Sequence, residues 1–287
     1  MRLKMVEYVE GENWRLSGAT LTLALLSFLC FIYTYKKTFL WLYERYTSPA
    51  SYYSHGFLIP LISAYLIWRK KDQLQRACPS SSGVGLSLIA LTLVVHILSV
   101  WTHIFFTSGF SILILAVGLS LYLFGPEFSR KIAFPLGFLA FMFPLPLQAI
   151  SAFSLPLKLM VANIAADIVK ALGVPLFREG AIIHLAKTSL AIGDPCTGIR
   201  SLISLLALGA LIAYFSNTTT LRRVILVLFA IPVAILANTL RVCALILAAN
   251  WFGGQWASPE HLFHLASGMT VFIISTILLF AAMRVLE

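Results

Sequence analysis

The chain has 287 residues, of which 60% are hydrophobic and 11% are charged, and its mean hydropathy is +0.91. This composition excludes a soluble globular domain and is typical of a polytopic membrane protein. A formal net charge of +10 would suit a nucleic-acid-binding protein, but the basic residues gather in short loops between apolar stretches, so we expect no nucleic-acid partner.

Eight apolar stretches are candidates to cross a lipid bilayer. A spanning helix needs about 20 apolar residues. The second stretch is short, and the fifth is interrupted by Pro135, Pro144 and Pro146. We therefore predict an all-α polytopic membrane helix bundle, with a single domain over residues 1–287 and about eight spans at 16–35, 52–68, 84–101, 104–124, 132–149, 199–215, 224–249 and 265–284.

The basic residues that flank these spans fall mainly on one predicted side of the membrane. Cytoplasmic loops are enriched in Lys and Arg, so this side is expected to be cytoplasmic. Eight spans then place both termini in the cytoplasm, including an N-terminal arm of residues 1–15. Lys36, Lys37 and Arg45, in the predicted first outer loop, are the exception. The residues that set the orientation are Arg69, Lys70, Lys71, Arg76, Arg130, Lys131, Arg222, Arg223 and Arg284.

The segment 150–195, between the fifth and sixth spans, is expected on the outer side of the membrane. Ser151 to Leu172 mixes apolar and charged residues, which predicts an amphipathic helix lying on, or packed at, the outer surface. Val174 to Ile192 contains two short β-prone runs around Gly180, which predicts a small hairpin. A strand edge in this hairpin could bind an extended peptide by strand addition, and a simple connector is the alternative.

Only one of the four cysteines is predicted to lie at the outer surface. Cys30 and Cys243 fall inside spans and Cys78 falls in a cytoplasmic loop, whereas Cys196 precedes the sixth span on the outer side. A disulfide framework is therefore not expected.

Cys196 lies in a polar turn that runs directly into the sixth span. Asp194 is a good N-cap and Pro195 suits the first helical position, so the pattern places Cys196 at the second position, among amides without carbonyl partners. A free thiol has a pKa of roughly 8.5; the helix dipole and Arg200 would favour the thiolate, and the charge of Asp194 would oppose it. The alternative is a small buried apolar cysteine at a helix start.

The seventh span contains a polar pair, Asn238 and Arg241, which lie three residues apart and therefore share a helix face. An arginine inside a span costs roughly 2.5 to 3.5 kcal/mol on insertion scales, so such residues usually face the protein interior and mark functional sites. The alternative is that Arg241 snorkels to the outer headgroups, because it lies about 25 Å along the helix from Val224. Snorkelling does not explain Asn238.

Histidines begin the second and eighth predicted spans at the outer surface. His264 opens the eighth span, and Gly268, one turn later, would let another helix approach closely. His261 lies a turn before His264 and could serve in its place. His55, at the start of the second span, is either a hydrogen-bonded anchor at the interface or a supporting residue of the site.

A thiol, an arginine and an imidazole from three segments thus fall in the same outer layer of the membrane. This combination suits acyl transfer: the Cys196 thiolate would attack a peptide carbonyl, His264 would move the proton, and Arg241 would stabilise the oxyanion. The resulting thioester would be resolved by an amine or by water. Arg200, Asn238 and His55 are predicted to support the site, and no cofactor or metal ion is expected.

Two other classes of function remain open. A transporter could use Arg241 and Asn238 as a substrate site, although no internal two-fold repeat is visible. A lipid acyltransferase could become acylated on Cys196. Residues that bind the substrate are not predicted in any of these cases.

Five motifs resemble those of the exosortases, in order and in spacing. Thr197 stands where that family more often has serine. The motifs are Tyr53-Ser54-His55-Gly56, Phe141-Met142-Phe143-Pro144-Leu145-Pro146, Cys196-Thr197-Gly198-Ile199-Arg200-Ser201, Asn238-Thr239-Leu240-Arg241 and His264-Leu265-Ala266-Ser267-Gly268.

The resemblance implies a membrane cysteine protease or transpeptidase that cleaves a C-terminal sorting signal of exported proteins. Such a signal, of the PEP-CTERM type, consists of a short Pro-Glu-Pro-like motif, a membrane helix and a basic tail. The resemblance gives the catalytic roles to Cys196, Arg241 and His264. It also implies a multi-pass protein of the bacterial inner membrane, with a periplasmic active site and an association with exopolysaccharide machinery.

Overall fold

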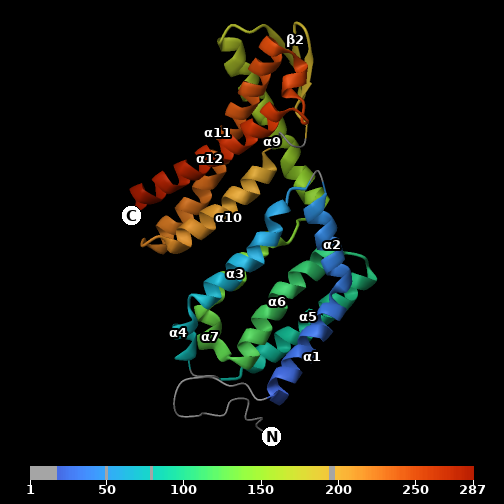
Figure 1. Cartoon of the computed structure of the whole chain (residues 1–287), viewed down its shortest axis with the longest axis vertical. Coiled ribbons are helices and arrows are strands. Elements are labelled where there is room, and N and C mark those ends of the chain that lie inside the picture. Colours follow the sequence, from blue (N-terminus) through green and yellow to red (C-terminus); the bar gives the residue numbers. More distant parts are fainter. Residues whose placement is uncertain (1–17, 49–50, 78–79, 194–197) are drawn as a thin grey trace.

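The computed structural model describes residues 18–48, 51–77, 80–193 and 198–287. Helices dominate these residues, and a small sheet lies at one end of the molecule (Figure 1), which confirms the predicted all-α bundle. The first half contains α1 (Gly18–Thr34), α2 (Lys36–Thr47), η1 (Ser54–Phe57), α3 (Leu58–Trp68), α4 (Lys71–Gln75), α5 (Gly83–Trp101), α6 (Phe105–Leu123), α7 (Gly125–Lys131), α8 (Ala133–Phe138) and η2 (Leu139–Met142). The second half contains α9 (Leu147–Ala171), β1 (Leu176–Glu179), β2 (Ile182–Leu185), β3 (Ser189–Ala191), α10 (Ile199–Phe215), α11 (Thr220–Phe252), η4 (Gly254–Ala257) and α12 (Leu262–Leu286).

Within the described residues, five helices are long and apolar enough to cross a membrane: α5, α6, α9, α11 and α12. The α1 and α2 helices form a sixth candidate, with a bend of 64° between them. Many large apolar side chains stay exposed, including Leu21 at 61%, Ile97 at 65% and Ile277 at 61%. Such surfaces suit lipid rather than water. The protein is therefore a multi-pass membrane protein, although the described helices do not confirm a count of eight spans.

Three predicted elements differ from the structure. The predicted first outer loop is largely helical, because α2 begins at Lys36. The predicted fifth span stops at Met142, where Phe143 turns extended before Pro144 and Pro146, and neither proline can continue a helix. The predicted surface helix is present as α9, but it begins at Leu147 and reaches the length and hydropathy of a membrane span.

Buried polar side chains join α5 and α6 to the junction of α1 and α2. The His96 ring bonds to Ser108 Oγ at 2.9 Å and to the Thr34 carbonyl at 3.1 Å, and the Tyr35 hydroxyl bonds to Ser111 Oγ at 3.0 Å. These contacts give His96 a structural role. A Cβ on Gly85 would collide with the backbone of α6, so this glycine permits the close approach of α5 and α6.

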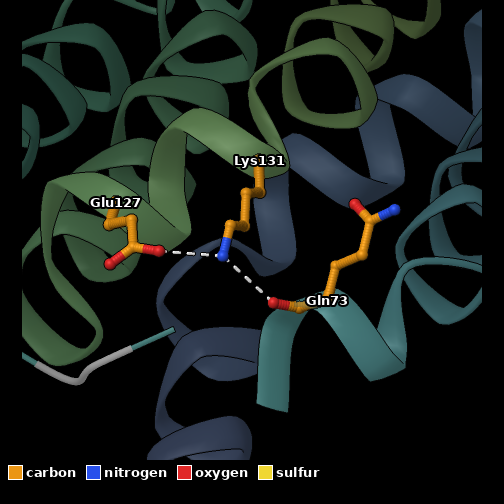
Figure 2. Close-up of polar contacts among 3 residues, drawn as sticks. All are labelled: Gln73, Glu127 and Lys131. Carbon is orange, nitrogen blue, oxygen red and sulfur yellow. Dashed lines mark hydrogen bonds and ion pairs between the residues drawn. The ribbon is translucent and has the colours of Figure 1, made fainter. Parts of the chain in front are cut away.

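The basic loops are connected to one another at one end of the molecule. Lys131 Nζ, on α7, donates to Glu127 Oε1 at 2.9 Å and to the Gln73 carbonyl on α4 at 3.1 Å (Figure 2). Lys70 Nζ donates to the Lys131 carbonyl and lies 5.3 Å from the centroid of the Tyr214 ring near the end of α10.

The C-terminus lies at this same end of α10 and α11. Arg222 donates to the Leu286 carbonyl at 2.8 Å, and Arg223 donates to the Ser216 carbonyl at 2.9 Å. The basic segments that the sequence assigns to one side of the membrane therefore gather at one end of these helices.

A compact cap covers the opposite end of α11. The α11 helix has 33 residues and is about 50 Å long, whereas the hydrocarbon core of a bilayer is about 30 Å thick. Its last third packs with the second half of α9 and with the sheet, which has the antiparallel order β1-β2-β3 (Figure 1). The apolar core of the cap includes Val161, Val169, Ile183, Val242 and Ile246, each at most 1% exposed. The predicted hairpin is thus present, extended by a third strand.

Candidate functional site

Arg241 and His264 are in direct contact where α11 meets the first turn of α12. Arg241 Nη2 donates to the His264 carbonyl oxygen at 3.2 Å, and Nε donates to Ser267 Oγ at 3.4 Å. Gly268 makes room for the guanidinium, since a Cβ there would lie 3.2 Å from Nη2. The partly buried Arg241 side chain is therefore turned toward another helix rather than extended toward headgroups. Gly268 was predicted to let another helix approach closely, and the space beside it is taken by the Arg241 side chain from α11.

The His264 ring is held in one orientation beneath the η4 turn. It is 5% exposed, and its Nδ1 lies 3.1 Å from the Ala257 carbonyl oxygen. A carbonyl only accepts hydrogen bonds, so Nδ1 carries the proton and Nε2 of the neutral ring keeps its lone pair. This is the tautomer that a general base needs, because Nε2 can take a proton while Nδ1 stays anchored.

The His261 ring makes different contacts from the His264 ring, although it lies only one turn before it. Its Nδ1 accepts a hydrogen bond from the Phe263 amide at 3.1 Å, which caps the N-terminus of α12. Its ring also packs on Trp256, with centroids 4.6 Å apart. These contacts make His261 a structural residue that positions the turn carrying His264.

Asn238 connects α11 to the start of α10. The Asn238 side chain is buried at 2% exposure, and a Cβ on Gly198 would lie 2.8 Å from its Nδ2. Gly198 adopts a left-handed conformation with φ of 78°, which glycine accepts without steric cost. The chain therefore enters α10 directly against Asn238, one turn of α11 before Arg241.

The predicted nucleophile, Cys196, lies outside the described residues, as do Asp194, Pro195 and Thr197. The predicted helix start at Asp194 and Pro195 lies outside the described residues as well. Among the residues that the structure describes, α10 begins at Ile199, directly after the left-handed Gly198. Cys196 accordingly precedes the first residue of α10 by three positions.

The two other supporting residues lie on or against α10. Arg200 is exposed on its first turn. His55 Nδ1 lies 3.2 Å from Ser204 Oγ, whose own proton goes to the Arg200 carbonyl at 2.9 Å, so Nδ1 is the donor. His55 Nε2 is buried without a hydrogen-bond partner among the described residues. His55 thus packs against α10.

A cavity of about 230 Å³ lies between β3 and the turn that precedes α12. One wall is the segment 189–193, and the opposite wall includes Val242, Leu245, Gly254, Ala257 and His264. The sequence did not predict this cavity, because segments far apart in the chain form it. The only available signal was the strand edge of the predicted hairpin.

A separate cavity of about 450 Å³ lies between the end of α2 and the start of α9, where Arg45, Tyr52 and Ser151 line it.

Within the described ranges, no three His, Cys, Asp or Glu side chains group closely enough to hold a metal ion.

A family model described as transmembrane exosortase matches residues 46–281, which is most of the chain. The chain belongs to the transmembrane exosortase family. Searches of curated proteins and of solved structures gave no match. The exosortase match includes Cys196, the contact between Arg241 and His264, and the strand that precedes the cysteine, and it supports a membrane transpeptidase-type function.

Proposed function

We propose that this exosortase is a membrane cysteine protease or transpeptidase that cleaves a C-terminal sorting signal of exported proteins. The contact between Arg241 and His264 carries the proposal, because α11 holds a cation against the backbone of a residue on α12 whose imidazole is itself held in one orientation. The packing of Gly198 on Asn238 brings the segment that follows Cys196 to the same part of α11. We propose Cys196 as the nucleophile, His264 as the base and acid, and Arg241 as the oxyanion-stabilising residue.

The reaction begins with transfer of the thiol proton from Cys196 to His264 Nε2. The thiolate attacks the carbonyl carbon of the scissile peptide bond, and the negative charge that develops on the carbonyl oxygen is stabilised by Arg241. Collapse of this intermediate breaks the C–N bond while His264 returns the proton to the leaving amine. The new N-terminus leaves with the C-terminal part of the substrate, and the N-terminal part remains as a thioester on Cys196.

An incoming amine or water completes the cycle. It attacks the thioester carbonyl, loses its proton through His264, and releases the thiol of Cys196. An amine gives a new amide bond and therefore sorting onto an acceptor, whereas water gives a free carboxylate. The substrate is expected to carry a membrane helix and a basic tail, so that the bilayer presents its signal to the site.

We place the site on the periplasmic side of the bacterial inner membrane, with both termini in the cytoplasm. Two observations support this orientation. The basic segments gather at the end of the bundle opposite the cap, and cytoplasmic loops are the ones enriched in Lys and Arg. Arg241 also follows about 30 Å of α11 counted from Thr220, which puts it at the far edge of the hydrocarbon core.

The test is co-expression with membrane-anchored proteins that end in a candidate sorting signal. Intact-mass analysis of each substrate then compares wild-type enzyme with Cys196→Ala. Wild-type enzyme should remove the C-terminal segment, and Cys196→Ala should leave the substrate at full length. Processing that survives Cys196→Ala would overturn the proposed nucleophile. A fatty acyl group on Cys196, instead of a peptide thioester, would indicate a lipid acyltransferase.

A further inference from the structure

Within the described part of the chain, no strand pairs with the outer edge of β3, the strand that leads toward Cys196. In the order β1-β2-β3, β3 is an edge strand, and it pairs with β2 in antiparallel register. The Ile192 amide donates to the Ala181 carbonyl at 2.9 Å, and the Leu185 amide donates to the Thr188 carbonyl at 2.8 Å. Antiparallel ladders alternate, so Ser189 and Ala191 direct their N–H and C=O groups away from β2.

The cavity of about 230 Å³ lies along this edge. The edge is closed near Thr188, which the backbone of Gly254 contacts, and the cavity continues from Ser189 to Gly193. Proteins usually protect free edges with charged residues or proline, but the segment 189–193 reads Ser-Leu-Ala-Ile-Gly and contains neither. The edge is thus open to another strand.

The walls of the cavity restrict what can enter it. Val242, Leu245, Ala257 and Pro259 make it mainly apolar, and among the described residues that line it His264 is the one titratable side chain. Its volume is below the roughly 300–1,000 Å³ of typical small-molecule pockets. Main-chain donors and acceptors on one side and a small apolar recess on the other are the requirements for an extended polypeptide with one uncharged side chain inserted.

We propose that an extended segment of the substrate polypeptide adds a fourth strand to the sheet by pairing with Ser189 and Ala191. This proposal rests on the proposed function and identifies where the substrate is held. The added strand lies beside His264, which lines the same cavity. Ala191 precedes Cys196 by five residues, so the proposed nucleophile is tethered within at most about 18 Å of this edge.

A proline substitution tests the outward-facing amide. Ala191→Pro removes an N–H that makes no bond to β2, and edge strands tolerate proline at such positions, so the sheet should persist. We expect kcat/KM for substrate cleavage to fall about three- to tenfold, the range for loss of one hydrogen bond. Ala191→Ser keeps the amide and should stay near the wild-type value. Equal activity of the two variants, with equal thermal stability, would contradict strand addition.

Crosslinking tests docking separately from chemistry. A photoreactive p-benzoylphenylalanine replaces Ser189 in the Cys196→Ala protein, which is co-expressed with a membrane-anchored substrate that wild-type enzyme processes. We expect a crosslink to the substrate near its cleavage position, and a much weaker one when the probe replaces Ser151 in the other cavity. A crosslink at Ser151 but not at Ser189 would overturn the docking proposal and leave the proposed chemistry intact. A Ser189 crosslink to a candidate protein that wild-type enzyme leaves intact would support the docking proposal and contradict the proposed cleavage of that candidate.

Strand pairing can also be tested by its two-residue periodicity along the substrate. Synthetic peptides that copy the crosslinked segment are methylated at one backbone nitrogen at a time and compete for the crosslink. A strand presents alternate amides to its neighbour, so methylation at every second residue should weaken competition about three- to tenfold, and methylation at the residues between should have little effect. Uniform sensitivity, or none at any position, would exclude strand pairing.

Discussion

Arg241 Nη2 donates a hydrogen bond to the carbonyl oxygen of His264 over 3.2 Å, so the guanidinium contacts the backbone of the residue proposed as base. Nε of the same guanidinium reaches Ser267 Oγ, which also donates to the His264 carbonyl at 2.8 Å. The planar group is thereby held by two of its N–H donors. A fixed cation can stabilise a developing oxyanion without rearranging during the reaction.

Arg241→Lys should abolish most processing even though it preserves the charge. A lysine ammonium is a point donor on a flexible stem and cannot reproduce both contacts of the planar guanidinium. We expect a loss of about 100-fold or more in the rate of substrate cleavage, with a folded protein by size-exclusion chromatography in detergent. Ser267→Ala removes only one of the two contacts and should cost several-fold at most. A lysine variant within a few-fold of wild type would remove Arg241 from the mechanism.

His264→Asn should block thioester formation while leaving the fold largely intact. The asparagine amide nitrogen takes the position of Nδ1 and can still donate to the Ala257 carbonyl, but it cannot accept and return a proton at neutral pH. Mass spectrometry of Cys196 after incubation with substrate should find no acyl-enzyme. The matched control is His261→Ala, which removes a helix cap. It should lower the free energy of unfolding by about 1 kcal/mol while keeping activity. The opposite pattern would exchange the roles of the two histidines.

Gly268→Ala should displace the Arg241 guanidinium by steric contact, without removing any group proposed to act in the reaction. The new methyl group would lie 3.2 Å from Nη2 and 3.3 Å from Cζ, so the guanidinium must shift by a few tenths of an ångström. We expect cleavage to fall about tenfold, since small displacements of positioned groups are costly. Gly137→Ala, another helical glycine but with no atom within 4 Å of the added Cβ, should leave cleavage unchanged. Equal effects of the two substitutions would point to helix propensity instead.

Gly198→Ala should destabilise the entry into α10. Its φ of 78° costs an L-residue roughly 1–2 kcal/mol, and the added Cβ would also lie 2.8 Å from Asn238 Nδ2. Gly173→Ala carries the same backbone penalty at φ of 87° but has open space around its Cβ. The difference in unfolding free energy between these variants isolates the contact with Asn238. Combining Gly198→Ala with Asn238→Ala should recover part of the stability, and an additive loss would argue against the contact.

His55→Ala should weaken the fold more than the chemistry. The substitution leaves Ser204 without its histidine donor and opens a space against α10, at a cost of about 1–3 kcal/mol. Cleavage per folded molecule should remain within a few-fold of wild type when the folded fraction is measured by chromatography. Loss of acyl-enzyme formation in a fully folded His55→Ala protein would instead place this histidine in the reaction.

Much of the C-terminal half followed from hydrophobic patterning. The stretch 199–215 was predicted as a span and forms α10 with these same bounds, and the polar pair on α11 faces the protein interior as its cost in lipid requires. The contact between Arg241 and His264 was not deducible from spacing alone, since it depends on how closely α11 and α12 approach at Gly268.

Some features depend on tertiary contacts that local signals do not contain. The α10 helix begins at Ile199, after the left-handed Gly198 that packs on Asn238, whereas the predicted helix start at Asp194 and Pro195 lies outside the described residues. Tyr46 and Tyr53 are buried, and their hydroxyls bond to the backbone of Met142 and Leu145, which a local pattern cannot reveal.

The part of α11 from Thr220 through Arg241 is one continuous helix, so it fixes the distance between these two residues. One end is anchored at the basic surface by Arg222 and Arg223, and the guanidinium of Arg241 sits at a fixed height above it. Under the proposed function, we therefore expect the cleavage position in a substrate that crosses the same bilayer to depend on distance from that surface as well as on sequence. Lengthening α11 by one turn below Asn238, about 5 Å, would shift the cleaved bond outward relative to the helix that anchors the substrate.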